Sequence, residues 1–154
     1  MRTQLPPDPY TVALRWLASR ELSVAQVRQR LRQRGFGTDQ IEATIDRLQR
    51  ARALDDRRTA GAYARTAVSI RLRGRARVLR DIEALGIDRE DAHAAIGEAF
   101  SEIDEATLLE RALARRLHGQ VQDLAHFRRL YQYLVRQGFP PGLAVAALRA
   151  RSVF

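Results

Sequence analysis

The feature that most constrains this chain is a glycine-centred pattern that recurs three times at nearly constant spacing. Gly35, Gly86 and Gly138 lie 51 and 52 residues apart. Apolar residues recur eight and four positions before each glycine, and one and ten positions after it: Val27, Leu31, Phe36 and Ile45; Val78, Ile82, Ile87 and Ile96; Leu130, Leu134, Phe139 and Leu148. Such self-similarity is typical of repeat proteins, which present long surfaces to macromolecules more often than they form small-molecule pockets.

The apolar residues between the glycines follow the period of an α-helix, and convincing two-residue alternation is absent. We therefore predict an all-α fold of three tandem three-helix repeats in an elongated array. The predicted segments are a flexible N-terminus (1–8), unit 1 (9–53), unit 2 (54–100) and unit 3 (101–154).

Each repeated glycine is interpreted as the residue just after a helix, where a positive φ disfavours any side chain. On this interpretation, replacing Gly86 with Ala should cost about 1 kcal/mol. Gly119 is predicted to end the first helix of unit 3 in the same way. A direct binding role for the repeated glycines is the alternative.

Polar residues mark the predicted helix starts. Ser23 and Gln26 form a capping-box pattern, and Thr38, Asp88 and Asp123 are candidate N-caps. Pro140 and Pro141 are predicted to open the last helix. Asp55 and Asp56 are predicted to begin a long helix that reaches about Leu72 and is followed by a break at Gly74.

The chain is strongly basic. Its 27 basic residues, all arginine, exceed its 18 acidic residues, which gives a net charge of +9. The exclusive use of arginine is better explained by a GC-rich genome than by a function, but the basic balance favours an anionic partner. The chain has no cysteine, which excludes disulfides and thiolate metal sites, and it has no apolar run long enough to cross a membrane. We expect a cytoplasmic protein, with no membrane association.

The most concentrated charge lies around Gly74. The five arginines there are Arg71, Arg73, Arg75, Arg77 and Arg80. Like charges in such a block repel one another, so we interpret the cluster as a site for phosphate or carboxylate groups, with a solvated surface as the alternative. The arginines at positions 28, 30, 32 and 34 are better explained by solvation. Arg128 and Arg129 lie near Tyr131 and Tyr133, where base stacking competes with core packing as an explanation.

Enzyme chemistry finds little support in the sequence. His93, His118 and His126 have no partner at metal-ligand spacing, and the glycines form no nucleotide-binding motif. The pair Asp55 and Asp56 is better explained by helix capping than by a divalent cation. We therefore expect no catalytic site, metal or cofactor.

Several of these patterns, taken in order, resemble the bacterial RecX family of recombination regulators. They are Ala13-Leu14-x-x-Leu17, Arg20-x-x-Ser23, Leu31-x-x-x-Gly35-Phe36, Leu54-Asp55-Asp56 with Ala60, Arg71-x-x-Gly74-x-x-Arg77-Val78, Ile82-x-x-x-Gly86-Ile87 and Leu134-x-x-x-Gly138-Phe139. The resemblance covers residues 11–151. The chain departs from the family at Thr59, where an aromatic residue is usual, and in its lack of lysine.

The resemblance implies a non-enzymatic monomer that binds the RecA recombinase. Such a protein would lie in the groove of the RecA–single-stranded DNA filament, inhibit strand exchange and ATP hydrolysis, and act in DNA repair and SOS control. Direct contact with single-stranded DNA is left open. Two alternatives remain from the residues alone: a DNA-binding regulator of helix-turn-helix type, and a helical scaffold with no nucleic-acid role.

Overall fold

The computed structural model describes residues 5–154, which form nine α-helices. The helices are α1 (Pro9–Ser19), α2 (Val24–Gln33), α3 (Thr38–Arg50), α4 (Asp56–Ser69), α5 (Arg75–Ala84), α6 (Arg89–Ala99), α7 (Glu105–Ala114), α8 (Leu124–Arg136) and α9 (Pro141–Arg149). Within residues 5–154 the only β-type pairing is an isolated bridge between Val121 and Ser152. The predicted all-α fold is confirmed.

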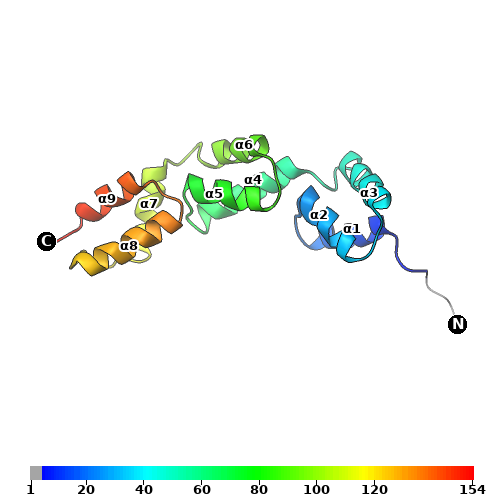
Figure 1. The fold of residues 1–154 in the computed structure, drawn as a ribbon. Coiled ribbons are helices and arrows are strands. Elements are labelled where there is room, and N and C mark those ends of the chain that lie inside the picture. Colours follow the sequence, from blue (N-terminus) through cyan, green and yellow to red (C-terminus); the bar gives the residue numbers. More distant parts are fainter. Residues whose placement is uncertain (1–4) are drawn as a thin grey trace.

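The helices pack in consecutive triplets: α1–α3, α4–α6 and α7–α9. The triplets follow one another along a bowed, elongated molecule with α1–α3 and α7–α9 at opposite ends (Figure 1). The order matches the predicted units, whose residue boundaries stay predictions. Residues 1–4 of the predicted flexible N-terminus lie outside the described part, whereas Asp8 has a defined role because its carboxylate accepts the Thr11 N–H and caps α1.

The repeat positions form the core. The residues eight and four positions before each glycine, and ten after it, are all buried in all three units. The buried residues nevertheless form two separate clusters: one lies between Val12 and Leu54, and the other extends without interruption from Ala60 to Leu148. Units 2 and 3 therefore share one apolar core, while unit 1 has its own.

The three repeated glycines end equivalent helices. Gly35, Gly86 and Gly138 have φ values of +89°, +79° and +97°, and each follows the C-cap of α2, α5 or α8. At two of these ends the next residue donates its N–H back into the helix, Phe36 to the Leu31 carbonyl and Phe139 to the Leu134 carbonyl, each at 3.2 Å. This is the Schellman arrangement, and it confirms the interpretation of the glycines as helix ends.

Most helix starts also agree with the sequence. Ser23 and Gln26 form the capping box, Asp55, Asp88 and Asp123 cap α4, α6 and α8, and Pro141 is the first residue of α9. The Thr38 prediction is wrong by one residue, because Gly37 is the N-cap of α3 and makes no side-chain cap bond.

Two helix ends differ from the prediction. Helix α4 stops at Ser69 rather than near Leu72, because the buried Leu72 has a φ of +52° and turns the chain into the core. Helix α7 stops at Ala114 rather than at Gly119, since Leu117 and Val121 are buried in the following irregular segment and draw it against the core. In both cases tertiary burial overrides the local sequence signal.

Candidate partner-binding surface

The arginine cluster lies where α5 begins. Gly74 is the N-cap of α5 and its N–H donates to the Gln137 carbonyl, at the end of α8, at 2.8 Å. A β-carbon on Gly74 would lie 2.5 Å from the Gly138 carbonyl oxygen. Only glycine lets the end of α8 approach this closely, so Gly74 is required for helix contact as well as for a chain break.

Two of the five arginines are held by an acidic residue within the same unit. Asp81 on α5 accepts from Arg73 at 2.7 Å and from Arg77 at 3.1 Å, and the Tyr63 hydroxyl donates to the same carboxylate at 2.7 Å. The Tyr63 pKa is raised by burial and by this carboxylate. Arg77 also donates to the Arg136 carbonyl at 2.9 Å. Arg73 and Arg77 therefore stabilise the fold.

The other three arginines of the cluster are exposed. The Arg75 guanidinium stacks over the Phe100 ring, 4.5 Å from its centroid. Arg71 and Arg80 make no side-chain hydrogen bond or ion pair with the residues of the described structure. Arg71 and Arg80 are consequently the members of the cluster best placed to bind an external anion.

Helices α8, α5 and α2 meet end to end and form one row. At the α8–α5 joint the Gln137 carbonyl accepts from Gly74. At the α5–α2 joint the Leu85 carbonyl, also at a C-cap, accepts from the hydroxyl of Ser23. The helices contain 13, 10 and 10 residues, so the row includes about 50 Å of helix at about 1.5 Å per residue.

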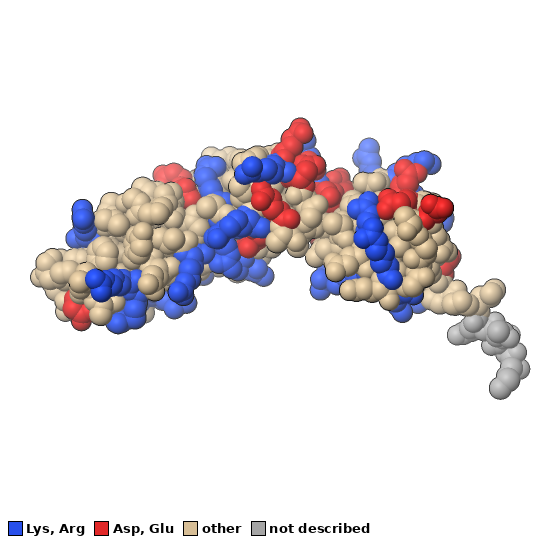
Figure 2. Space-filling model, viewed as in Figure 1, with Lys and Arg blue, Asp and Glu red and all other residues tan. Residues whose placement is uncertain are grey.

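The row is basic along its length. Helices α2 and α8 contain no acidic residue, whereas α3 and α6 each contain three, at positions 39, 42 and 46 and at positions 90, 91 and 98. Figure 2 shows arginines gathered over α5 and α8, and acidic side chains gathered toward the start of α6. In units 1 and 2 the third helix is therefore more acidic than the second, whereas α9 of unit 3 contains no acidic residue.

Aromatic side chains elsewhere on this surface contact arginines. Arg30 and Arg34 lie 5.5 and 6.0 Å from the centroid of Trp16, and Arg116 lies 4.3 Å from that of Tyr133. Arg28 is paired with Glu42 at 2.7 Å. The arginines of α2 therefore make more contacts within the protein than the predicted solvation implies, and one face of Tyr133 is already covered.

The predicted acidic pair has two different structural roles. Asp55 caps α4 by accepting the Arg58 N–H at 3.1 Å, whereas Asp56 accepts the Val24 N–H, at the start of α2, at 2.8 Å. The pKa of Asp56 is raised by partial burial and by the nearby carboxylates of Asp91, Asp88 and Asp55. Within residues 5–154 no group of three acidic or histidine residues is placed to hold a metal ion, and no helix is long and apolar enough to span a membrane.

Comparison with known proteins identifies the family. A sequence profile described as RecX, first three-helix domain, matches residues 10–48. The regulatory protein RecX of Syntrophotalea carbinolica is 33% identical over 138 residues, which cover 86% of this chain and 88% of that protein. The chain belongs to the RecX family. The RecX protein of Treponema pallidum is 36% identical over 86% of this chain and 78% of its own length.

RecX crystal structures show the same fold. RecX from Lactobacillus salivarius superposes with a TM-score of 0.71 at 21% identity, over 92% of this chain and 95% of the other. A second RecX crystal structure gives a TM-score of 0.74 at 18% identity, over 92% of this chain and 70% of the other. The family is one of regulatory proteins, in agreement with the expected absence of enzymatic activity.

Several residues that organise this surface were not identified from the sequence. Tyr63 and Asp81 hold the arginine cluster together, and only the spacing of Arg77 and Asp81, one helical turn apart, hinted at this. Thr59, the departure from the family pattern, is buried and its hydroxyl donates to Glu21 at 2.8 Å. The substitution therefore provides a polar contact between units 1 and 2.

Proposed function

We propose that this protein regulates the RecA recombinase by binding RecA–single-stranded DNA filaments and inhibiting strand exchange and ATP hydrolysis. Membership of the RecX family, supported by matches over 86% of the chain, is the observation that carries the proposal. Within this proposal the protein acts as a cytoplasmic monomer in DNA repair and SOS control.

The basic row of α2, α5 and α8 is the surface proposed to meet the filament. It is long and it lacks acidic residues on two of its three helices. Its middle helix, α5, contains the exposed Arg80, and the exposed Arg71 lies in the turn just before α5. Guanidinium groups bind both phosphate and carboxylate through paired N–H donors. The row is therefore suited to an anionic groove made of protein, DNA or both.

The test compares two variants that each lose two positive charges. The first combines Arg71→Gln with Arg80→Gln, and it spares Arg73 and Arg77 because these hold Asp81. The matched control combines Arg50→Gln with Arg149→Gln, two exposed arginines on the third helices α3 and α9. Arg50 pairs with Asp46 on the surface, and exposed pairs of this kind contribute at most about 1 kcal/mol.

Each protein is sedimented with RecA filaments on single-stranded DNA, and RecA ATP hydrolysis is followed in the same sample. We expect the first variant to bind more weakly and to show a flatter salt dependence, by up to about one unit of log–log slope per lost phosphate contact. The control variant should resemble the unmodified protein. If both variants behave alike, the row is not the binding surface. If the unmodified protein leaves RecA unaffected, the proposed function is wrong.

Direct contact with single-stranded DNA is a finer part of the proposal. Arg128, Arg129 and Arg136 are exposed on α8, the unit 3 part of the basic row. Arg129 and Arg136 are seven residues apart and therefore share one face of the helix. Binding to naked single-stranded DNA, measured beside filament binding at several salt concentrations, separates DNA contacts from contacts with RecA carboxylates. A helix-turn-helix regulator would instead protect a specific duplex sequence.

A further inference from the structure

The two joints of the row are built on the same three contacts. In the first contact, the glycine that follows one helix packs against the start of the helix that precedes it in the row. Gly86, after α5, packs against Ala25 of α2, and Gly138, after α8, packs against Arg77 of α5. A C-cap carbonyl of the later unit accepts from the N-cap of the earlier helix. The third contact is a carboxylate that accepts the first N–H of the earlier helix: Asp56 accepts from Val24 at 2.8 Å, and Glu105 accepts from Arg75 at 2.9 Å.

What surrounds these contacts differs between the joints. Around the α8–α5 joint, the buried apolar residues of units 2 and 3 form one continuous cluster. Around the α5–α2 joint there is no such continuity in the described structure, because the cluster of unit 1 ends at Leu54 and the next begins at Ala60. Movement at the α5–α2 joint would leave both apolar clusters intact.

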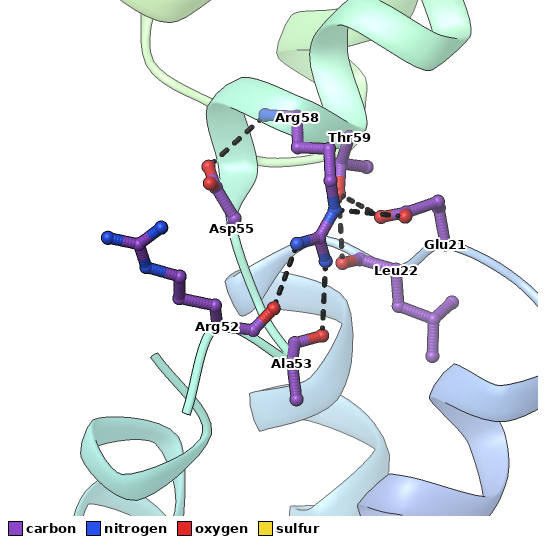
Figure 3. A network of polar contacts seen from close by, with 7 residues as sticks. All are labelled: Glu21, Leu22, Arg52, Ala53, Asp55, Arg58 and Thr59. Carbon is purple, nitrogen blue, oxygen red and sulfur yellow. Dashed lines mark hydrogen bonds and ion pairs between the residues drawn. The ribbon is translucent and has the colours of Figure 1, made fainter. Parts of the chain in front are cut away.

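Polar contacts of both buried and exposed side chains make up the rest of the α5–α2 joint, since Thr59 is buried and Arg58 is exposed. Glu21 accepts from Arg58 at 3.1 Å and from Thr59 at 2.8 Å (Figure 3). The side chains of Arg58 and Glu21 are 42% and 41% exposed, so water competes for their ion pair. Unit 1 is therefore held by one exposed ion pair and a few hydrogen bonds, and among the described residues no apolar core is shared with unit 2.

The connecting chain at this joint is short, and hydrogen bonds hold it to the start of α4. Residues 51–55 link α3 to α4, and Arg58 donates to the carbonyls of Arg52 and Ala53 at 2.8 and 3.2 Å. Arg52 has a φ of +56°, an uncommon value for a residue other than glycine. Figure 1 shows α1–α3 as a body joined to the rest at this edge. Contact at one edge permits rotation without unfolding.

We propose that the α5–α2 joint is a hinge, about which unit 1 turns relative to a rigid body formed by units 2 and 3. Glu21 and Asp56 act as its latch, because their bonds with Arg58, Thr59 and Val24 must break for unit 1 to turn. Turning changes the curvature of the basic row at one defined point and leaves the α5–α8 part of the row unchanged.

Double electron–electron resonance spectroscopy, which measures the distances between two spin labels, tests the hinge. The chain has no cysteine, so introduced cysteines take the labels without background. Gln29→Cys on α2 with Thr66→Cys on α4 reports on the α5–α2 joint, and Thr66→Cys with Gln132→Cys on α8 reports on the α8–α5 joint. All three positions are exposed. We expect a wider distance distribution for the first pair than for the second.

Variants of the latch make the test specific. Glu21→Ala with Asp56→Ala should widen the distribution of the first pair and leave the second unchanged. Glu105→Ala removes the contact at the α8–α5 joint that corresponds to Asp56, and it should widen neither pair, because the shared core still holds that joint. Asp56→Asn keeps an oxygen that accepts from Val24 and should leave the first pair as it is, which provides a folded control.

Two results would overturn the proposal: equal widths for the two pairs in the unmodified protein, or a first pair that does not respond to the double alanine variant. These measurements use the protein alone, without RecA, so their outcome is independent of the proposed function.

Discussion

The free end of α2 and the joined end of α8 have the same local structure but different surroundings. Gly35 and Gly138 have φ values of +89° and +97°, and the residue after each donates to the same position of its helix. A β-carbon on Gly35 would meet nothing within 4 Å, whereas one on Gly138 would lie 2.3 Å from the Arg77 backbone nitrogen. One sequence motif therefore ends a helix in both places and joins two units in only one.

Gly86 is the second joined end, but its neighbour is a side chain rather than backbone. Its β-carbon would lie 2.4 Å from the Ala25 β-carbon. The three glycines thus form a graded series, from a helix end in open space to one in contact with a methyl group to one in contact with backbone. Substitutions at these positions separate the cost of a positive φ from the cost of lost space between units.

The largest effect is expected at Gly138. Gly138→Ala should lower the free energy of unfolding by about 2–4 kcal/mol, because strain at positive φ is added to overlap with the α5 backbone. Gly35→Ala should cost only about 1 kcal/mol, since strain is its only penalty. Urea unfolding followed by circular dichroism measures both. Equal costs at the two positions would contradict the distinction between free and joined ends.

An intermediate effect is expected at Gly86. Gly86→Ala should cost about 2 kcal/mol, more than the estimate of about 1 kcal/mol from the sequence, because Ala25 occupies the space that the new methyl group needs. Ala25→Gly alone should cost up to about 1 kcal/mol through lower helix propensity. The double variant should cost less than the sum of the two, since it removes the overlap. Strict additivity would show that the two residues do not press on each other.

The smallest effect is expected at Asp56. Asp56→Asn keeps the oxygen that accepts from Val24 and removes a charge whose pKa is raised by partial burial and by neighbouring carboxylates. At neutral pH it should stabilise the protein slightly, by up to about 0.5 kcal/mol, because the group is partly exposed and water screens it.

The pH dependence of this effect has a definite sign. A pKa raised by folding means that the ionised carboxylate opposes folding at neutral pH and that protonation removes this cost. The stability difference between Asp56→Asn and the unmodified protein should therefore shrink as the pH falls through the raised pKa of Asp56. Thermal melts of both proteins between neutral and acidic pH measure it. A difference that grows on acidification would show that the charge of Asp56 stabilises the joint.

The sequence by itself determined the helices, the repeat and the family. Each depends on residues close together in the chain: the Ser23 capping box, the aspartate caps of α4, α6 and α8, and the glycines that end α2, α5 and α8. These signals act through backbone conformation and hydrogen bonds within one helical turn, so they are readable without the fold. The sequence predicted the wrong helix ends near Leu72 and at Gly119, because burial against residues far apart in the chain set those ends.

Only the tertiary structure decided how the arginines are used and how the units are joined. Five arginines around Gly74 are equivalent as sequence, but Asp81 holds Arg73 and Arg77 and leaves Arg71 and Arg80 available. The joints depend on pairs far apart in the chain, such as Ser23 with Leu85 and Arg75 with Glu105, separated by 62 and 30 residues. Such contacts form only after the helices of each unit have packed, because the packed units set the distance between groups that the chain itself leaves far apart.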